Sequence, residues 1–390
     1  MKWEKVAIKD ICTGIYDGPH ATPPLSDTGA IFLGISNFNN GRLDFSDIRY
    51  ISEDDLPKWT KRVIPQKNDI VFSYEATLNL YAIIPEGFRG CLGRRMALLR
   101  VDETKADYKF LYYYFYSDAW RATVNENIVL GATVDRIPLI KFSDFPVELP
   151  PLETQHRIAD ILSAYDDLIE NNQKQIKLLE EAAQRLYKEW FVDLRFPGHE
   201  NMEIVDGVPE GWKKERLVDI AEIQYGYAFD GTLFNADKNG TPIIRIRNIP
   251  QAETMDYTTE HVSENYLVQN GEIIVGMDGE FHINAWAGNT AYLVQRVCCI
   301  RPKNTEIKGW LLQAIYEPIK FFERTVVGAT VAHLGKKHLD SIYLLTSPEE
   351  FYEPFKTFFD KRLLLMNQNR KLREARDRLL PKLMSGEVEV

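Results

Sequence analysis

The sequence has few cysteines and no long apolar run. Its four cysteines are Cys12, Cys91, Cys298 and Cys299. They show neither CxxC nor Cys/His ligand spacing, which favours reduced, buried thiols over a disulfide framework or a zinc site. No apolar stretch approaches the length of a bilayer-spanning helix, and no secretory segment follows Met1. We therefore expect a cytoplasmic protein with no metal site and no membrane partner.

A surplus of positive charge is also missing. The formal net charge is -10, whereas nucleic-acid-binding proteins usually carry a basic surplus that neutralises phosphates. If this chain binds DNA, local basic clusters or a partner protein must supply the phosphate contacts. The length of 390 residues and the 45% hydrophobic content suit two or three ordinary globular domains, each with its own core.

Motifs of common catalytic sites are missing as well. Residues 328–337 end in Gly-Lys-Lys, but they have the wrong spacing for a phosphate-binding loop and lack its hydroxyl residue. Neither Pro23-Pro24 nor Pro150-Pro151 lies in the Asn/Asp-Pro-Pro-aromatic pattern of adenine methyltransferases, and the seven histidines form no HxxxH pair. We expect no catalytic residue in this chain. The alternative of a fused endonuclease requires a Mg²⁺-binding carboxylate cluster that the sequence does not reveal.

What the sequence does contain is an internal repeat. The matched positions are Trp3 with Trp212, Asn37 with Asn248, residues 131–134 (Gly-Ala-Thr-Val) with 328–331, and Pro151 with Pro348. Because these matches occur in the same order along both halves, the chain is a duplication of a unit of roughly 200 residues. Each unit begins with short β-type runs between turn residues and ends in a helical pattern.

The helical patterns are heptad stripes. One consists of Leu162, Ile169, Ile176, Ala183 and Trp190, and the other of Phe351, Phe358, Leu365, Leu372 and Leu379. They predict two long helices that pair antiparallel within one chain, because the duplication supplies one partner for each; dimerisation between chains is the alternative. Asn172 and Asn369 fall inside these stripes, where a buried Asn can fix register. Direct DNA contact is the other interpretation of these asparagines.

Several segments resemble the specificity subunits of type I restriction-modification systems. They are residues 150–162, 166–172, 185–191, 196–198, 207–212 and 379–386. The resemblance implies an α+β fold in which two β-rich target-recognition domains are separated by two long antiparallel helices, in a pseudo-twofold duplicated chain. The first repeat departs from the family pattern, since Trp3 has no Gly-x-Pro-Glu-Gly lead-in. Its cap is therefore expected from the distal region after Ser385.

The resemblance also implies a function. Such a chain is a non-catalytic DNA-binding subunit that reads an asymmetric bipartite target in double-stranded DNA. It docks two adenine-methyltransferase subunits and also restriction/translocase subunits. The chain itself has no cofactor, and S-adenosylmethionine belongs to the partner methyltransferase. A helix of about 40 residues is about 60 Å long, enough to separate two readers by about one DNA turn. A protein-binding coiled-coil scaffold without DNA reading is the alternative, and it would explain the acidic balance.

The same comparison predicts the domain boundaries. We expect a first target-recognition domain over 1–150, a central spacer helix over 151–195, a second target-recognition domain over 196–347 and a distal spacer helix over 348–390. The recognition residues should lie on loops, where sequence varies without disturbing the fold.

Candidate DNA-contacting residues combine turn chemistry with groups that bond to bases or phosphates. In the first domain they are Tyr16, Asp17, His20, Thr22, Tyr74, Glu75, Thr77, Arg94, Arg95 and Thr133. In the second they are Tyr225, Tyr227, Arg245, Arg247, Asp278, Glu280, His282, Asn284, Arg296, Thr330 and Lys336. Arg245 and Arg247 alternate along one expected strand and so should share a face. Purely structural loops and solvated turns are the alternative for these positions.

Overall fold

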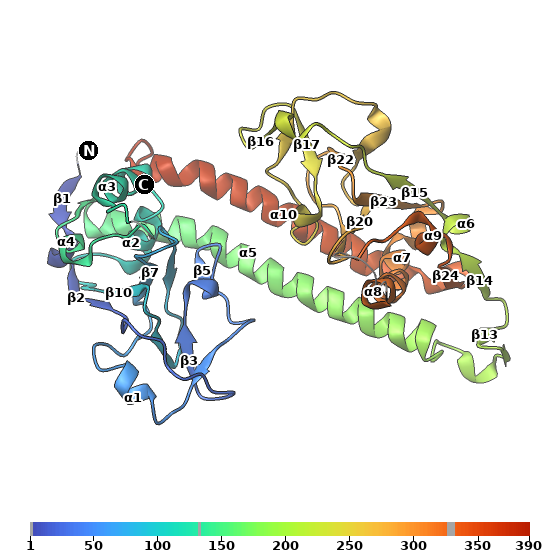
Figure 1. Cartoon of the computed structure of the whole chain (residues 1–390), viewed down its shortest axis with the longest axis horizontal. Coiled ribbons are helices and arrows are strands. Elements are labelled where there is room, and N and C mark those ends of the chain that lie inside the picture. Colours follow the sequence, from blue (N-terminus) through green and yellow to red (C-terminus); the bar gives the residue numbers. More distant parts are fainter. Residues whose placement is uncertain (1–2, 132–133, 326–331) are drawn as a thin grey trace. The chain divides into compact units, whose positions relative to one another are not determined.

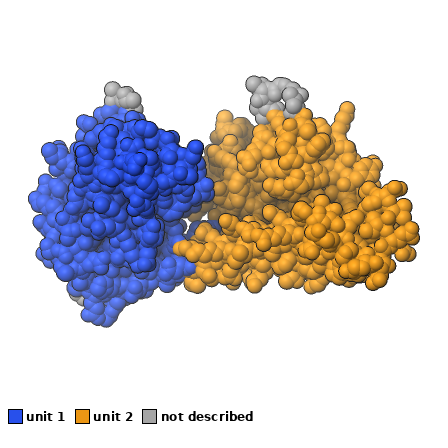
Figure 2. All heavy atoms as spheres, turned by 90° about the horizontal axis from the view of Figure 1, so that it is seen from below, with its two compact units in different colours: residues 1–167, 373–390 blue, residues 168–372 orange. Residues whose placement is uncertain are grey.

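A computed structural model describes residues 3–131, 134–325 and 332–390 of the chain. The chain divides into two compact units (Figure 2). Unit 1 comprises residues 1–167 and 373–390, and unit 2 comprises residues 168–372. Two long helices, α5 (Leu152–Tyr187) and α10 (Glu353–Met384), contribute residues to both. None of the helices in the described part of the chain is both long and apolar enough to cross a membrane.

Unit 1 is built mainly of short strands. Its elements before α5 are β1 (Glu4–Ala7), η1 (Ile8–Asp10), β2 (Cys12–Asp17), β3 (Ala30–Leu33), η2 (Ile35–Asn37), β4 (Phe38–Asn39), β5 (Arg42–Leu43), β6 (Tyr50–Ile51), α1 (Leu56–Trp59), β7 (Ile70–Ser73), β8 (Tyr81–Ile83), β9 (Gly90–Leu92), β10 (Met96–Val101), α2 (Tyr108–Tyr114), α3 (Asp118–Asn127), α4 (Leu139–Phe142) and β11 (Pro146–Leu149). An antiparallel sheet of order β2-β10-β7-β8 forms its centre (Figure 1). A three-stranded sheet β6-β3-β9 and the pairs β1-β11 and β4-β5 complete it.

Unit 2 repeats this plan. After α5 and its π-helical end η3 (Lys188–Val192) come η4 (His199–Asn201), β12 (Ile204–Val205), β13 (Val208–Pro209), β14 (Lys213–Arg216), α6 (Leu217–Ile220), β15 (Ala221–Tyr225), η5 (Gly231–Leu233), β16 (Phe234–Asn235), β17 (Thr241–Ile244), η6 (Ile246–Asn248), β18 (Tyr257–Thr258), η7 (Glu264–Tyr266), β19 (Leu267–Val268), β20 (Ile273–Gly276), β21 (Ile283–Ala285), β22 (Ala291–Leu293), β23 (Val297–Pro302), η8 (Thr305–Ile307), α7 (Lys308–Ala314), α8 (Tyr316–Thr325), α9 (Lys336–Asp340), β24 (Tyr343–Thr346) and η9 (Glu349–Phe351). Its central sheet has the order β15-β23-β20-β21, the counterpart of β2-β10-β7-β8. The pair β14-β24 likewise matches β1-β11. The internal repeat predicted from the sequence is therefore a repeat of topology.

The strands form where buried apolar residues follow one another. All four residues of β7 and of β20 are buried, as expected for strands covered on both faces. The short helices begin at polar caps: Asp107 accepts a hydrogen bond of 2.7 Å from Phe110 N at the start of α2, and the Ser117 side chain caps α3. Each unit thus has its own apolar core beside its central sheet.

The two long helices pair within each unit. In unit 2, Asn172 Nδ2 donates to Asn369 Oδ1 at 2.9 Å, and both side chains are buried. In unit 1, Arg376 Nη1 lies 2.5 Å from Asp166 Oδ1, and Leu383 packs into the core. The expected intramolecular pairing is confirmed, and the asparagines bind each other at the helix interface.

The C-terminal region after Ser385 packs against the start of the first repeat, as expected from the absence of a Gly-x-Pro-Glu-Gly segment before Trp3. Trp3 lies against Gly386, where a Cβ atom would come within 3.4 Å of the indole Nε1. Val390 packs against the same core. In unit 2 the corresponding Trp212 packs instead on Phe196, with the ring centroids 4.6 Å apart. Phe196 lies in the segment that follows α5.

Candidate nucleic-acid interface

The topology of unit 1 gathers several candidate residues at one sheet edge. Strand β10 is antiparallel to both β2 and β7, so its beginning meets their ends. Ala97 faces Asp17 on one side, and Met96 faces Ser73 on the other. The residues that follow β2 and β7, and those that precede β10, therefore lie together although they are far apart in sequence.

A further segment joins this edge. Ala76 N donates to Asp135 O at 3.0 Å, and Ile137 N donates to Tyr74 O at 2.8 Å. Glu75 and Arg136 form an isolated antiparallel bridge. We call these loops, with the described part of residues 129–136, the recognition edge of unit 1. The candidate Thr133 lies outside the described residues.

Unit 2 has a recognition edge with the same backbone frame. Tyr225 faces Cys298, and Gly276 faces Val297. The adjoining segment is held in the same way: Gly279 N donates to Ala332 O at 3.1 Å, and Leu334 N donates to Met277 O at 2.7 Å. Asp278 and His333 form the bridge that corresponds to Glu75 and Arg136. The candidate Thr330 is not among the described residues.

Charged groups at the edge of unit 1 surround Asp17. Its carboxylate is paired with Arg62, and His20 Nε2 lies 3.0 Å from Oδ2. Arg94 is exposed, whereas Arg95 is half-buried and its Nε has no partner within the described part of the chain. The candidates Thr22 and Thr77 are exposed, and Tyr16 and Glu75 are half-buried. This edge therefore presents several hydrogen-bond donors beside carboxylates.

The buried side chain of Tyr74 contacts the backbone of this edge. Its hydroxyl donates to Arg94 O at 2.9 Å. Burial, reinforced by the charge of Asp17, raises the pKa of Tyr74 to about 12, so the phenol stays neutral at physiological pH. Tyr74 therefore holds the backbone of Arg94 in place.

At the edge of unit 2 the carboxylate of Asp278 has two partners. Arg296 Nε lies 3.3 Å from Oδ2, and His333 Nδ1 lies 2.5 Å from Oδ1. Arg296 is half-exposed and has a φ of 73°, a left-handed conformation that is uncommon outside glycine. Glu280 and Lys336 are exposed nearby in sequence, on the loop after β20 and at the start of α9. A basic and an acidic group thus stand side by side at this edge.

Two aromatic candidates of unit 2 occupy different surroundings. Tyr225 ends β15, and its hydroxyl is buried without a partner among the described residues. Burial raises the pKa of Tyr225 to about 12. Tyr227 packs on Phe229 and Tyr266, with ring centroids 5.0 and 5.2 Å apart. Tyr227 is therefore part of an aromatic cluster beside the edge.

The expected placement of Arg245 and Arg247 on one strand is wrong. Strand β17 ends at Ile244, and the two arginines lie in and just before the turn η6. The reason is Asn248, whose Oδ1 accepts from Arg245 N at 2.8 Å and turns the chain out of the sheet. Its counterpart Asn37 makes the same contact with Gly34 N at 2.9 Å.

Asn284 lies inside the protein. Its Nδ2 donates to Ile249 O at 3.0 Å and to Pro250 O at 3.1 Å, and its Oδ1 accepts from Arg362 at 2.7 Å. Because these bonds occupy the buried amide, we leave it out of the DNA-contacting set proposed below. His282, by contrast, is half-buried and lies 3.6 Å from Glu280.

Sequence reasoning missed two basic residues of unit 1. Arg62 reaches Asp17 from a loop 45 positions away, and no local pattern indicates that contact. Arg136 could have been predicted from the internal repeat, because it follows the first Gly-Ala-Thr-Val motif as His333 follows the second.

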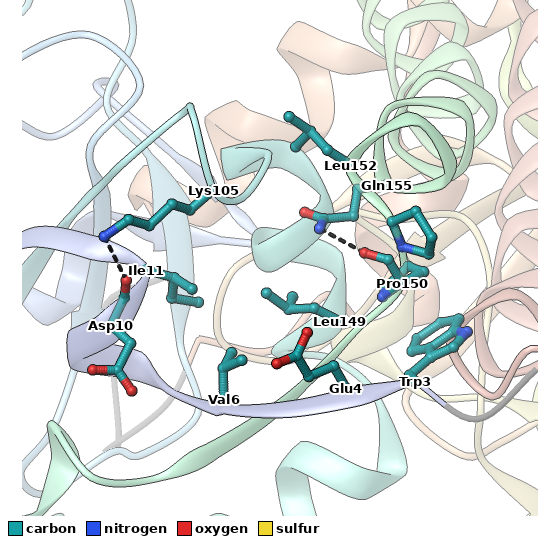
Figure 3. Close-up of a pocket in the computed structure, with 11 residues that line it drawn as sticks. Trp3, Glu4, Val6, Asp10, Ile11, Lys105, Leu149, Pro150, Leu152 and Gln155 are labelled. Carbon is teal, nitrogen blue, oxygen red and sulfur yellow. Dashed lines mark hydrogen bonds between the residues drawn. The ribbon is translucent and has the colours of Figure 1, made fainter.

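A hollow of about 560 Å³ opens elsewhere in unit 1 (Figure 3). Its walls include Trp3, Pro150 and Gln155, and Gln155 Nε2 donates to Pro150 O at 2.9 Å. It also borders Asp10 and Lys105, which lie before β2 and after β10 and hence at the end of the sheet opposite the recognition edge. The hollow is therefore separate from the recognition edge. No group of three or more metal-ligating side chains occurs within the described ranges.

Comparisons with known proteins identify the class to which this fold and these edges belong. A family model described as the type I restriction modification DNA specificity domain matches residues 1–181 and 209–350. The chain belongs to this family. It carries two copies of a domain that recognises DNA sequence, and it is a non-catalytic specificity subunit.

Individual relatives agree with this assignment. The chain is 25% identical over 366 residues to the type I restriction enzyme MjaIX specificity subunit of Methanocaldococcus jannaschii, covering 88% of this chain and 82% of that protein. It is 23% identical to the putative MjaX specificity subunit of the same organism, over 100% of this chain and 94% of the other. The type I S subunit from M. genitalium has a similar fold, with a TM-score of 0.58 at 17% identity, covering 98% of this chain and 96% of that one.

Proposed function

We propose that the two recognition edges read the two halves of an asymmetric bipartite DNA target. One observation carries the proposal: both units build the same backbone frame at the same sheet edge, yet place different side chains on it. A shared frame lets each edge dock on a duplex in the same way, and unlike side chains select unlike bases. The target is therefore bipartite and not palindromic.

The chemistry of each edge suits direct reading of bases. Arginine binds guanine O6 and N7, and a carboxylate accepts from cytosine N4. Arg296 beside Asp278 offers both groups in unit 2, and the exposed Arg94 and the carboxylate of Asp17 offer them at the edge of unit 1. We assign a phosphate contact to the exposed Lys336 at the start of α9.

We extend the proposal to protein partners. Three leucines on the long helices are exposed, with 52% for Leu168, 64% for Leu178 and 56% for Leu364. Exposed apolar side chains on long helices suit a docking surface for another protein. Two adenine-methyltransferase subunits bind here, carry S-adenosylmethionine and supply phosphate contacts that the acidic chain lacks. Restriction/translocase subunits join the same assembly.

The domain boundaries belong to the proposal as well. The recognition domains occupy 1–150 and 196–347, and the spacer helices occupy 151–195 and 348–390. The helices then set the distance between the two half-sites.

The test selects duplexes from a random library with the full chain bound to its methyltransferase subunit. Arg296→Ala should relax the preference at one or two bases of a single half-site, by about 1–3 kcal/mol per lost base contact. Arg216→Ala is the matched control, because Arg216 is also about half-exposed and paired with an aspartate, Asp219, but lies before β15 at the opposite end of the sheet. Equal effects of both substitutions, or no selected sequence at all, would overturn the proposal. The second result would favour a protein-binding scaffold.

A further inference from the structure

Arg362 is a buried arginine on α10, with only 8% of its surface exposed. Its Nε donates to Glu180 Oε1 on α5 at 2.7 Å. Its Nη2 donates to Asn284 Oδ1 on β21, also at 2.7 Å. All three residues lie in unit 2, so this guanidinium joins the paired helices to the central sheet of that unit.

Asn284 passes this connection on to the turn η6. Its Nδ2 donates to the carbonyl oxygens of Ile249 and Pro250, at 3.0 and 3.1 Å. These two residues directly follow η6, the turn that presents Arg245 and Arg247. A continuous set of buried hydrogen bonds therefore runs from the spacer helix to the backbone that carries two basic candidates.

No such connection occurs among the described residues of unit 1. From the alignment of Asn172 with Asn369, the residue at the position of Arg362 is Tyr165. From the strand registers, the residue at the position of Asn284 is Ala82, which has no polar side chain. Unit 1 uses a different link, in which Arg42 of β5 donates to Asp166 O of α5 at 2.9 Å.

We infer that Arg362 is a positioning residue for recognition of the second half-site, acting through Asn284 on the turn that carries Arg245 and Arg247. The inference rests on the proposed function, because it assumes that this turn contacts DNA. A buried hydrogen bond from a charged donor holds its acceptor in one geometry, and its loss allows the acceptor to reorient. The turn would then sample several orientations, and base discrimination would fall even though Arg362 touches no DNA.

The experiment measures discrimination at each half-site separately. Full-length Arg362→Met, Asn284→Ala and the double variant are assembled with the methyltransferase subunit. Each is titrated with duplexes that carry single base changes in one half-site. We expect each single variant to lose about tenfold in discrimination at the second half-site and nothing at the first. The double variant should lose no more than either single variant, because both substitutions break one connection.

Lys361→Met is the matched control, since it removes one positive charge from the adjacent, exposed position of the same helix. It should leave both half-sites unchanged. Arg362→Lys should recover part of the discrimination, because the ammonium can still bond to Asn284. Recovery distinguishes positioning from a general loss of stability, which is measured in parallel by thermal unfolding.

The outcomes separate the two proposals. Unchanged second half-site discrimination in folded Arg362→Met and Asn284→Ala overturns the inference while leaving DNA reading by the edge intact. If Arg362→Met does not fold, Asn284→Ala decides in the same way. If Arg296→Ala also leaves discrimination unchanged, the proposed function itself fails.

Discussion

Across the central sheet of unit 1, Asp17 faces Ala97, and in unit 2 Tyr225 stands in the same place opposite Cys298. The other positions of the two recognition edges correspond as closely. The pairs are Glu75 with Asp278, Ala76 with Gly279, Arg95 with Arg296, and Arg136 with His333. The backbone bonds that hold these positions are the same. Some side chains on them differ, such as Asp17 and Tyr225 or Arg136 and His333, whereas Arg95 and Arg296 are the same residue type.

The contrast between a shared backbone frame and partly different side chains separates two roles in the duplicated chain. Strand pairing and the hydrogen bonds between loops determine where each edge lies, and they depend on backbone groups that any sequence possesses. The side chains at the edge are free to change, because few of them belong to the core. Under the proposed function, the repeat preserves a docking surface while the recognised bases diverge.

We expect the largest change in the methylated DNA sequence when one whole recognition edge is exchanged. Replacing residues 1–150 with the matching domain of a relative should change one half-site completely and leave the other half-site and the gap unchanged. The reason is that each edge is built within a single unit. Methylation-site mapping in cells checks the outcome. A simultaneous change in both half-sites would show that the edges do not act independently.

The next largest change is expected in the gap between the half-sites when α5 and α10 are lengthened. Matched heptads inserted after Glu170 and after Lys371 fall between two helix contacts, Asp166–Arg376 and Asn172–Asn369, and so preserve both. One heptad adds about 10 Å of helix, and DNA advances about 3.4 Å per base pair. The gap should lengthen by up to about three base pairs.

Matched four-residue insertions serve as the control for this experiment. They add about one turn to each helix but shift the apolar stripe, so they should lower stability. An active heptad variant that methylates sites with the original gap would contradict a spacing role for the helices.

A smaller effect tests how the helix contact differs between the units. Both units join their helices by an ion pair, Asp166–Arg376 in unit 1 and Glu180–Arg362 in unit 2, and unit 2 adds the paired amides of Asn172 and Asn369. Asn172→Leu should lower the free energy of unfolding by about 2 kcal/mol, because it leaves a buried amide without its partner. The double variant with Asn369→Leu should recover most of this loss. Urea denaturation measures both, and additive losses would mean that the two amides do not depend on each other.

The smallest effect compares the matched turn positions Ala76 and Gly279, whose φ angles are 69° and 70°. Gly279→Ala should destabilise the protein by about 1 kcal/mol, because a Cβ strains the left-handed conformation. Ala76→Gly should stabilise it slightly. Gly231→Ala is the control, since Gly231 also has open space around it but no positive φ. A destabilising Ala76→Gly, or a Gly279→Ala that does not destabilise, would show that the two frames differ.

Much of this architecture could be predicted from the sequence because it depends on periodic patterns. The heptad stripes indicated both helices. The repeated Asn37 and Asn248 indicated two matching apolar strands, although β3 and β17 end four residues before these asparagines. The same asparagines also explain the misplaced arginines. The Asn248 side chain accepts a hydrogen bond from Arg245 N, three residues earlier. Strand β17 therefore ends at Ile244, one residue before Arg245.

Contacts between distant segments could not be predicted in this way. The role of Asn284 depends on Arg362, which lies 78 positions further along the chain. The pairing of Arg62 with Asp17 spans 45 positions. Such contacts arise from tertiary packing, and a single sequence contains no local pattern that reports them.

The central claim is that two edges with a common frame read two different half-sites. Long-read mapping of methylated adenines, in cells that express this chain with its methyltransferase subunit, tests it most directly. We predict one motif made of two unlike half-sites separated by a gap of fixed length and unspecified sequence. A single uninterrupted motif, or two identical half-sites in inverted orientation, would contradict it.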